Sequence, residues 1–135
     1  MSLEQDRAAI LDLAHRFDDT NDAGDFDAHT ALFADGFSFE SSFGNSANTA
    51  DYREWVEGFH SQMKEQGGTR HFALNPIIEL DGDEASMKSY LLIVSQGDGR
   101  TLGTAVATDR LRRTADGWKL VKRALVADDN VPSGK

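Results

Sequence analysis

Three turns that contain Asp-Gly divide the second half of the chain, and this feature limits the possible folds more than any other. The turns lie at residues 81–83, 96–99 and 115–117. Each joins two runs in which apolar and polar residues alternate, and Asp-Gly between such runs is a strong signal for a β-hairpin. We therefore expect four consecutive antiparallel strands, over residues 70–80, 84–95, 100–114 and 118–127.

The start of the chain has helical periodicity instead. Apolar residues recur at steps of three and four from Ile10 to Phe17, which predicts an amphipathic helix that ends near Gly24. Asp25 is a suitable N-cap for a short second helix. We expect that helix to include Phe33 and to end at Asp35-Gly36.

A strand and a third helix are expected next. Phe37, Phe39 and Phe43 alternate with polar residues, which indicates a first strand followed by a polar loop at 44–48. A helix from Thr49 to Gln66 follows, and its apolar stripe most simply packs in a core. The residues of this stripe are Tyr52, Trp55, Val56, Phe59 and Met63.

Helices followed by a run of antiparallel strands are the α+β pattern. Long strands must twist strongly, and a bent sheet closed at one end by helices forms a cone with a cavity. The chain has 135 residues and shows no internal repeat, linker or low-complexity segment. We expect one domain over residues 1–135, with an ordered core of about 5–127 and a frayed tail from 128 to 135.

Charge and composition exclude several functional classes. The net charge of −9 argues against nucleic-acid binding, which needs a basic surface. The absence of cysteine excludes a disulfide scaffold and cysteine catalysis, and it agrees with a reducing cytoplasm. No apolar run approaches the ~20 residues of a membrane span, and no leader peptide is visible. The four histidines are scattered, and no cofactor motif is present, so we expect a cytoplasmic protein without metal or cofactor.

The strand at 70–80 carries the first candidate site residues. One face, with Phe72, Leu74 and Ile78, is expected to be core. The other face places His71 and Asn75 on the same side, as in the wall of a ligand pocket. On periodicity alone, the simpler interpretation is that His71 is a partly exposed strand residue with no special role.

Asp22 is the second candidate. It lies in a cluster of acidic residues at the end of the first helix, where carboxylates are unfavourable with the helix dipole. Most of these side chains are simply solvated. If Asp22 reaches a histidine, it would orient the ring and raise its basicity, and the histidine could then act as a general base.

Arg123 is the third candidate, because the alternation of the last strand puts it among Val121, Leu125 and Ala127. A guanidinium buried there without a partner would cost several kcal/mol. Two alternatives are open. Arg123 pairs with an acidic residue near the first helix, or it binds an anionic or carbonyl group of a ligand.

With these residues in view, the sequence from about Gln5 to Ala127 resembles the SnoaL-like domain of the nuclear transport factor 2-like superfamily. The resemblance is carried by segments at 8–13, 22–27, 32–35, 80–83 and 116–120, together with His71 and Asn75. It implies a cone-shaped barrel of a curved, mainly antiparallel sheet with three helices in the N-terminal half.

The pattern is most similar to the lyase branch of that superfamily, which includes a dehydrochlorinase, scytalone dehydratase and bile-acid dehydratase. These enzymes have an Asp–His dyad, and the resemblance assigns its two positions to Asp22 and His71. It also makes Arg123 a pocket arginine. Phe17 departs from the pattern, because the relatives have a lysine or tyrosine there. The general acid is therefore missing or supplied elsewhere, by Tyr52 or Tyr90.

These inferences give a cofactor-independent lyase, dehydratase or isomerase that acts on a small, partly apolar molecule. His71 would be the base, and Asp22 would orient it. Arg123, Asn75, Phe17, Tyr52 and Trp55 would contact the substrate. The alternative is a non-catalytic ligand-binding or assembly module of the same fold. We also expect a homodimer or homotrimer, because the strand at 100–114 offers Leu102, Val106 and Thr108 along one exposed side.

Overall fold

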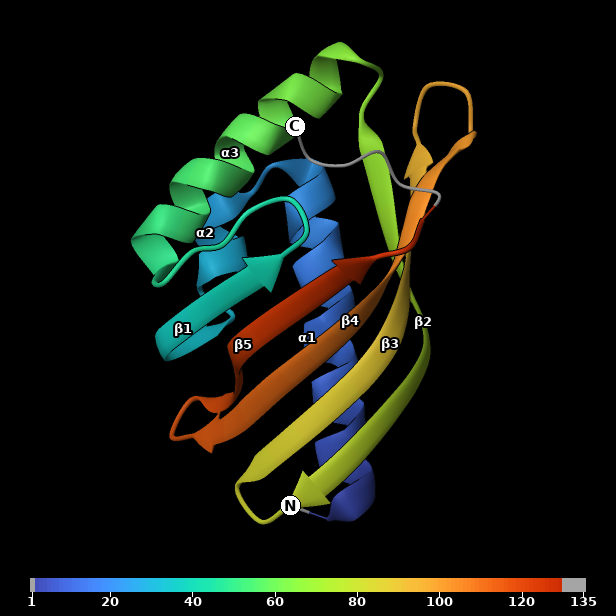
Figure 1. Ribbon diagram of the computed structural model, residues 1–135. Coiled ribbons are helices and arrows are strands. Elements are labelled where there is room, and N and C mark those ends of the chain that lie inside the picture. Colours follow the sequence, from blue (N-terminus) through green and yellow to red (C-terminus); the bar gives the residue numbers. More distant parts are fainter. Residues whose placement is uncertain (1, 130–135) are drawn as a thin grey trace.

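The computed structural model describes residues 2–129, which form three helices and five strands (Figure 1). Most of the tail that was expected to fray lies outside the described residues. The elements in chain order are α1 (Leu3–Ala23), α2 (Phe26–Thr30), β1 (Phe33–Ser41), α3 (Thr49–Glu65), β2 (Thr69–Asp81), β3 (Glu84–Ser95), β4 (Thr101–Thr114) and β5 (Gly117–Ala127).

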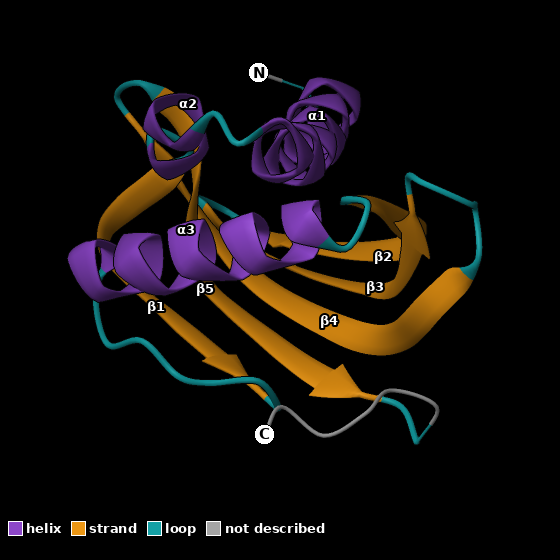
Figure 2. Ribbon diagram, turned by 90° about the horizontal axis from the view of Figure 1, so that it is seen from above, coloured by secondary structure: helices purple, strands orange, loops and turns teal. Residues whose placement is uncertain are grey.

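The strands form one mixed sheet in the order β1-β5-β4-β3-β2. The pairs β2–β3, β3–β4 and β4–β5 are antiparallel, as the Asp-Gly turns predicted, and β1 pairs with β5 in parallel. The sheet is strongly curved, and all three helices lie on its concave side (Figure 2). This is the expected α+β cone.

The long helix α1 has defined ends. Ser2 and Gln5 form a reciprocal capping box at its start, and Gly24 ends it in the left-handed conformation, with φ of 73°. Near its start, the buried Asp6 accepts two hydrogen bonds from Arg113 of β4 and one from Trp118 of β5. These bonds lower the pKa of Asp6 to about 2 and fasten the first turns of α1 to the far end of the sheet.

The region after α1 differs from the expectation. The second helix ends at Thr30, and Phe33 already belongs to β1 instead of the helix. Asp35-Gly36 does not end a helix. It forms an irregularity inside β1, where the register with β5 shifts and Gly36 has a φ of 80°. Glycine tolerates the positive φ that this irregularity uses, and a glycine is also the local signal that marks a helix end.

The structure differs most from the expected one in β2, where the inner and outer faces are not those that the alternation predicted. Its register with β3 shifts between Leu74 and Ile77, and Asn75 has a φ of 53°. This bulge exchanges the two faces of the strand, because side chains alternate with period two. Phe72 and Leu74, expected in the core, lie on the outer face and are each 41% exposed, whereas Ile78 beyond the bulge is buried.

The hydrophobic core lies between α1, α3 and the concave face of the sheet. The contributions from the sheet include Phe37 and Phe39 of β1, Met87 of β3 and Leu111 of β4. The convex face stays free of helices (Figure 2). Within residues 2–129, no helix is long and apolar enough to cross a membrane.

Candidate active site

The contact expected between Asp22 and His71 is present. Asp22 Oδ1 lies 2.5 Å from His71 Nδ1, and Asp22 Oδ2 accepts the backbone N–H of His71 at 2.8 Å. Both side chains are only 8% exposed. These two hydrogen bonds to one carboxylate hold both the His71 ring and the backbone of β2 in place.

The arrangement determines which nitrogen of His71 is basic. A carboxylate only accepts hydrogen bonds, so the proton of the neutral ring is on Nδ1 and Nε2 carries the lone pair. The Asp22 carboxylate would also stabilise the imidazolium that forms when Nε2 takes up a proton. The pair therefore has the arrangement of a general base, His71, whose ring is oriented by the carboxylate of Asp22.

His71 lines a cavity between α1, α3 and the concave face of the sheet, whereas Asp22 lies behind the histidine. The cavity is mainly aromatic and aliphatic. It leaves only about 40 Å³ for the centres of water molecules, and one water needs roughly 10–15 Å³ on this measure. A larger ligand must displace some side chains. The lining includes Phe17, Asn21, Phe39, Phe43, Tyr52, Trp55, Phe59, His71, Leu91, Ile93, Arg123 and Leu125.

Arg123 is both a cavity residue and a structural ion-pair partner. Its Nε and Nη2 donate to the two carboxylate oxygens of Asp109, at 2.8 and 3.1 Å. The partner lies on β4, opposite Arg123 in the sheet, and not near the first helix as one alternative held. The guanidinium also lies 4.2 Å from the centre of the Phe17 ring, in a cation–π contact.

Asp18 lies one helical turn before Asp22 and is buried. Its Oδ1 has no hydrogen-bond partner among the described residues. Burial raises the pKa of Asp18, opposed by the nearby positive charge of Arg123. The hydroxyl of Ser89, on β3, is also buried and has no described partner. The interior therefore holds a carboxyl group whose pKa lies above its ordinary value.

A chain of hydrogen bonds fixes the proton of Tyr52. The hydroxyl of Thr20 donates to the carbonyl of Arg16 at 2.7 Å, so its oxygen accepts from Nδ1 of His29 at 2.8 Å. Nε2 of His29 then accepts the Tyr52 hydroxyl at 2.9 Å. Burial lowers the pKa of His29 to about 3, which keeps the ring neutral, and burial raises the pKa of Tyr52.

The structure brings most of the expected site residues together. Phe17, Tyr52, Trp55, His71 and Arg123 all line the cavity, and Asp22 supports His71. The expectation that Asn75 lines the pocket beside His71 does not hold. Asn75 lies at the bulge of β2, is exposed and does not line the cavity, because the bulge ends the alternation that linked it to His71.

Neither tyrosine is placed as a free general acid. Tyr90 lies on the outer face of β3, 47% exposed, and outside the cavity. Tyr52 lines the cavity, but its proton is directed to His29. Sequence reasoning did not identify Asn21 or the aromatic residues Phe43 and Phe59. The position of Asn21, directly before Asp22 on the buried side of α1, was the only available signal.

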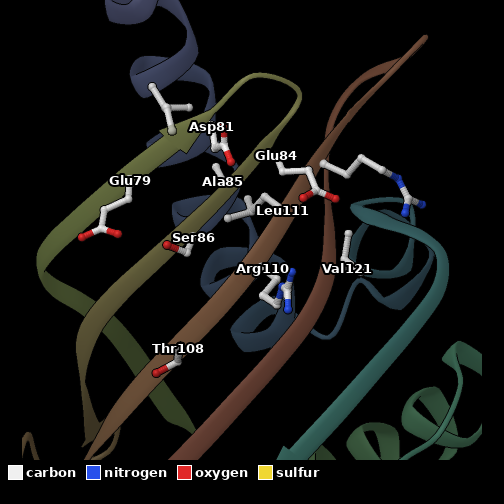
Figure 3. A pocket seen from close by; sticks show the side chains of 11 residues that line it. Glu79, Asp81, Glu84, Ala85, Ser86, Thr108, Arg110, Leu111 and Val121 are labelled. Carbon is white, nitrogen blue, oxygen red and sulfur yellow. The ribbon is translucent and has the colours of Figure 1, made fainter.

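A second, larger depression lies away from this cavity, over the outer face of the sheet near the β2–β3 turn (Figure 3). Glu79, Ser86 and Arg110, which lie in register on neighbouring strands, point into it. The depression is open, and its charged side chains are exposed to solvent. It contains none of the expected site residues. Within residues 2–129, no group of three histidine, aspartate or glutamate side chains could hold a metal ion.

Fold and site together define a small α+β cone in which a histidine, held by an aspartate, borders an aromatic cavity. Residues 4–124 match the family model of the SnoaL-like domain. The chain belongs to this family, as its sequence resemblance indicated. No protein of curated function matches the chain in sequence.

Solved structures support the fold. A Nostoc punctiforme protein of unknown function with a cystatin-like fold is 28% identical, with a TM-score of 0.84 over 95% of both chains. A nuclear transport factor 2-like protein from Novosphingobium aromaticivorans is 22% identical, with a TM-score of 0.85 over 94% of this chain and 84% of its own. A Streptomyces avermitilis protein, provisionally assigned as a dehydratase of that family, is 18% identical, with a TM-score of 0.83 over 94% and 99%. The last two show the fold alone.

Proposed function

We propose that the protein is a cofactor-independent lyase or isomerase that removes a proton from carbon in a small, largely apolar substrate. The observation that carries the proposal is the 2.5 Å contact between Asp22 Oδ1 and His71 Nδ1, with His71 at the wall of an apolar cavity. A base positioned in this way typically accelerates proton transfer ~100- to 10,000-fold.

In the proposed reaction, His71 Nε2 takes a proton from a substrate carbon, and Asp22 stabilises the resulting imidazolium. The electron pair of the broken C–H bond has two possible outcomes. In a lyase it forms a C=C bond while a leaving group departs from the adjacent carbon with its own bonding pair. In an isomerase the double bond moves, and His71 returns the proton to a different carbon.

The cavity supports an apolar substrate, because most of its lining is aromatic or aliphatic. Burial of apolar surface contributes roughly 25 cal/mol per Å² to binding. The Streptomyces avermitilis neighbour, with its provisional assignment as a dehydratase, agrees with lyase chemistry.

The second candidate is a non-catalytic binding module. Two observations favour it. Phe17 cannot donate a proton where the lyases have a lysine or tyrosine, and the proton of Tyr52 is held by His29.

A dehydratase with a poor leaving group needs an acid, so an isomerase or a lyase with a good leaving group fits this site better.

A thermal-shift screen of small cyclic ketones, halogenated hydrocarbons and hydroxylated aromatic compounds, followed by product analysis of the hits, tests the proposal. We expect at least one hit to be converted, and His71→Gln to lose the conversion while it keeps binding. Hits that bind tightly but are never converted would favour the binding module.

A further inference from the structure

Asn21 is a cavity residue whose side chain has no described use. It is 9% exposed and lines the cavity from α1. Its backbone carbonyl accepts the N–H of Gly24 and so serves the helix end. Its carboxamide has no hydrogen-bond partner among residues 2–129. In this part of the chain the fully buried side-chain atoms without a partner are Asp18 Oδ1 and Ser89 Oγ. The carboxamide of Asn21 therefore keeps some accessible surface, and a ligand in the cavity can bind it.

Arg123 offers a second unused donor to the same cavity. Asp109 takes Nε and Nη2, and Nη1 has no hydrogen-bond partner within the described chain. The ion pair holds the guanidinium rigidly, because it satisfies two of its nitrogens inside the protein. The remaining nitrogen is a donor in a fixed position that carries part of a positive charge.

Three residues that line one apolar cavity, on three different elements, therefore each keep a polar group without a hydrogen-bond partner among residues 2–129. Nε2 of His71 on β2 is an acceptor and a base. Nη1 of Arg123 on β5 is a donor, and the carboxamide of Asn21 on α1 can turn its NH₂ group toward a ligand. Asn21 directly precedes Asp22 in α1, so it belongs to the same helix end that positions the base.

We propose that Asn21 and Arg123 together bind the carbonyl oxygen of the substrate. This inference rests on the proposed function, and it specifies the substrate class as a ketone, aldehyde or ester with a proton on the neighbouring carbon and an apolar remainder. When His71 takes that proton, the electrons of the C–H bond form a C=C bond and the carbonyl π electrons move to oxygen. The resulting enolate is stabilised by N–H donors from Asn21 and Arg123, which form an oxyanion hole.

Binding of 4-nitrophenol tests the proposal without any known substrate. Its phenolate oxygen resembles an enolate, and its neutral and ionised forms absorb at different wavelengths. We expect the wild type to prefer the phenolate and to lower the apparent pKa of the bound compound. Asn21→Leu should weaken phenolate binding about 10- to 100-fold, as expected for a lost hydrogen bond to a charged group, with little effect on the neutral form. If the leucine variant folds poorly, the same titration is made with Asn21→Ala, because alanine is a good helix former.

Phe59→Leu is the matched control, because it removes apolar lining without a donor. It should weaken both forms equally and leave their ratio unchanged. The inference is overturned if the wild type binds neither form, if it shows no preference, or if the Asn21 variants keep the wild-type ratio.

The proposed function fails separately. His71→Gln should retain the phenolate preference, since it leaves both donors in place. If His71 variants keep full conversion of a substrate while the Asn21 effect on phenolate is present, the oxyanion site stands and the base assignment is wrong.

Discussion

Arg123 and Asp109 face each other on neighbouring strands and form a two-point ion pair inside the cone, with side chains only 3% and 1% exposed. Burial lowers the pKa of Arg123, but the charge of Asp109 and its hydrogen bonds, together with smaller contributions from Asp18 and Tyr52, raise that pKa above its ordinary value. The pair supports the sheet, and it holds in place an arginine that also lines the cavity.

Arg123→Leu should destabilise the protein strongly. The substitution leaves the Asp109 carboxylate buried without its partner, which typically costs about 3–5 kcal/mol, or ~10 °C or more in melting temperature. The double variant Asp109→Leu with Arg123→Met should recover most of this loss, because it removes both charges. Ligand binding should be weakened in both variants. Thermal unfolding combined with 4-nitrophenol titration separates the two roles, and unchanged stability in Arg123→Leu would contradict the structural one.

His29 should make the protein sensitive to mild acid. Burial lowers its folded-state pKa from 6.5 to about 3, so only the unfolded chain takes up this proton between those values. Above the unfolded-state pKa of 6.5, His29 does not lower the free energy of unfolding. Below that pKa, the free energy of unfolding falls as pH falls, by about 2 kcal/mol near pH 5. His29→Gln should be less stable at neutral pH but lose less on acidification. Urea unfolding at about pH 7 and pH 5 measures both, and equal pH dependence in the two proteins would refute the account.

Asp18→Asn should have the opposite effect on pH dependence. Burial raises the folded-state pKa of Asp18, so the wild type is penalised as pH rises above the unfolded value of 3.8. The amide has the same shape without a charge. We expect the variant to melt a few degrees higher at neutral pH, and the difference to disappear near pH 4. A lower melting temperature at neutral pH would mean that Asp18 is ionised and held by Arg123.

The convex face of the sheet should form a homodimer interface. Leu74, Tyr90, Val106 and Val126 lie in register across four strands, and this row is apolar and partly exposed. Exposed apolar patches of this kind usually mark interfaces. Sedimentation at micromolar concentration should give a dimer that Val106→Glu dissociates. Leu3→Glu, at an exposed apolar site on α1, is the control and should have no effect. A monomeric wild type would show this expectation to be wrong.

The sequence predicted the hairpins, α1 and α3 well, because each of these depends on local signals such as Asp-Gly turns, the glycine at the end of α1 and apolar periodicity. It failed at Asp35-Gly36, which forms an irregularity inside β1 instead of a helix end, and at Asn75-Pro76, where a bulge exchanges the two faces of β2. Such a bulge depends on pairing with a distant strand, and the alternation pattern alone does not contain it. Phe72 and Asn75 were misplaced for this reason.

The candidate site was predictable in part. The resemblance to the lyases paired Asp22 with His71, and the residues alone could not, since 49 positions separate them. The Asp109 partner of Arg123 was not foreseen, because it depends on the β4–β5 register. Asn21 was not foreseen either, because one buried carboxamide among many acidic residues carries no distinctive pattern.

Hydrogen–deuterium exchange at carbon shows directly whether His71 acts as a base on a substrate carbon. Small aryl and cyclic ketones are incubated with the protein in D₂O, and the loss of the proton signal next to the carbonyl is followed by NMR. If His71 is the base, the wild type should accelerate exchange of at least one ketone, and His71→Gln should abolish this acceleration. Asp22→Asn should lower it by roughly 100-fold or more. Exchange that stays at the buffer rate with every ketone, or that persists in His71→Gln, would contradict the assignment of His71 as a base.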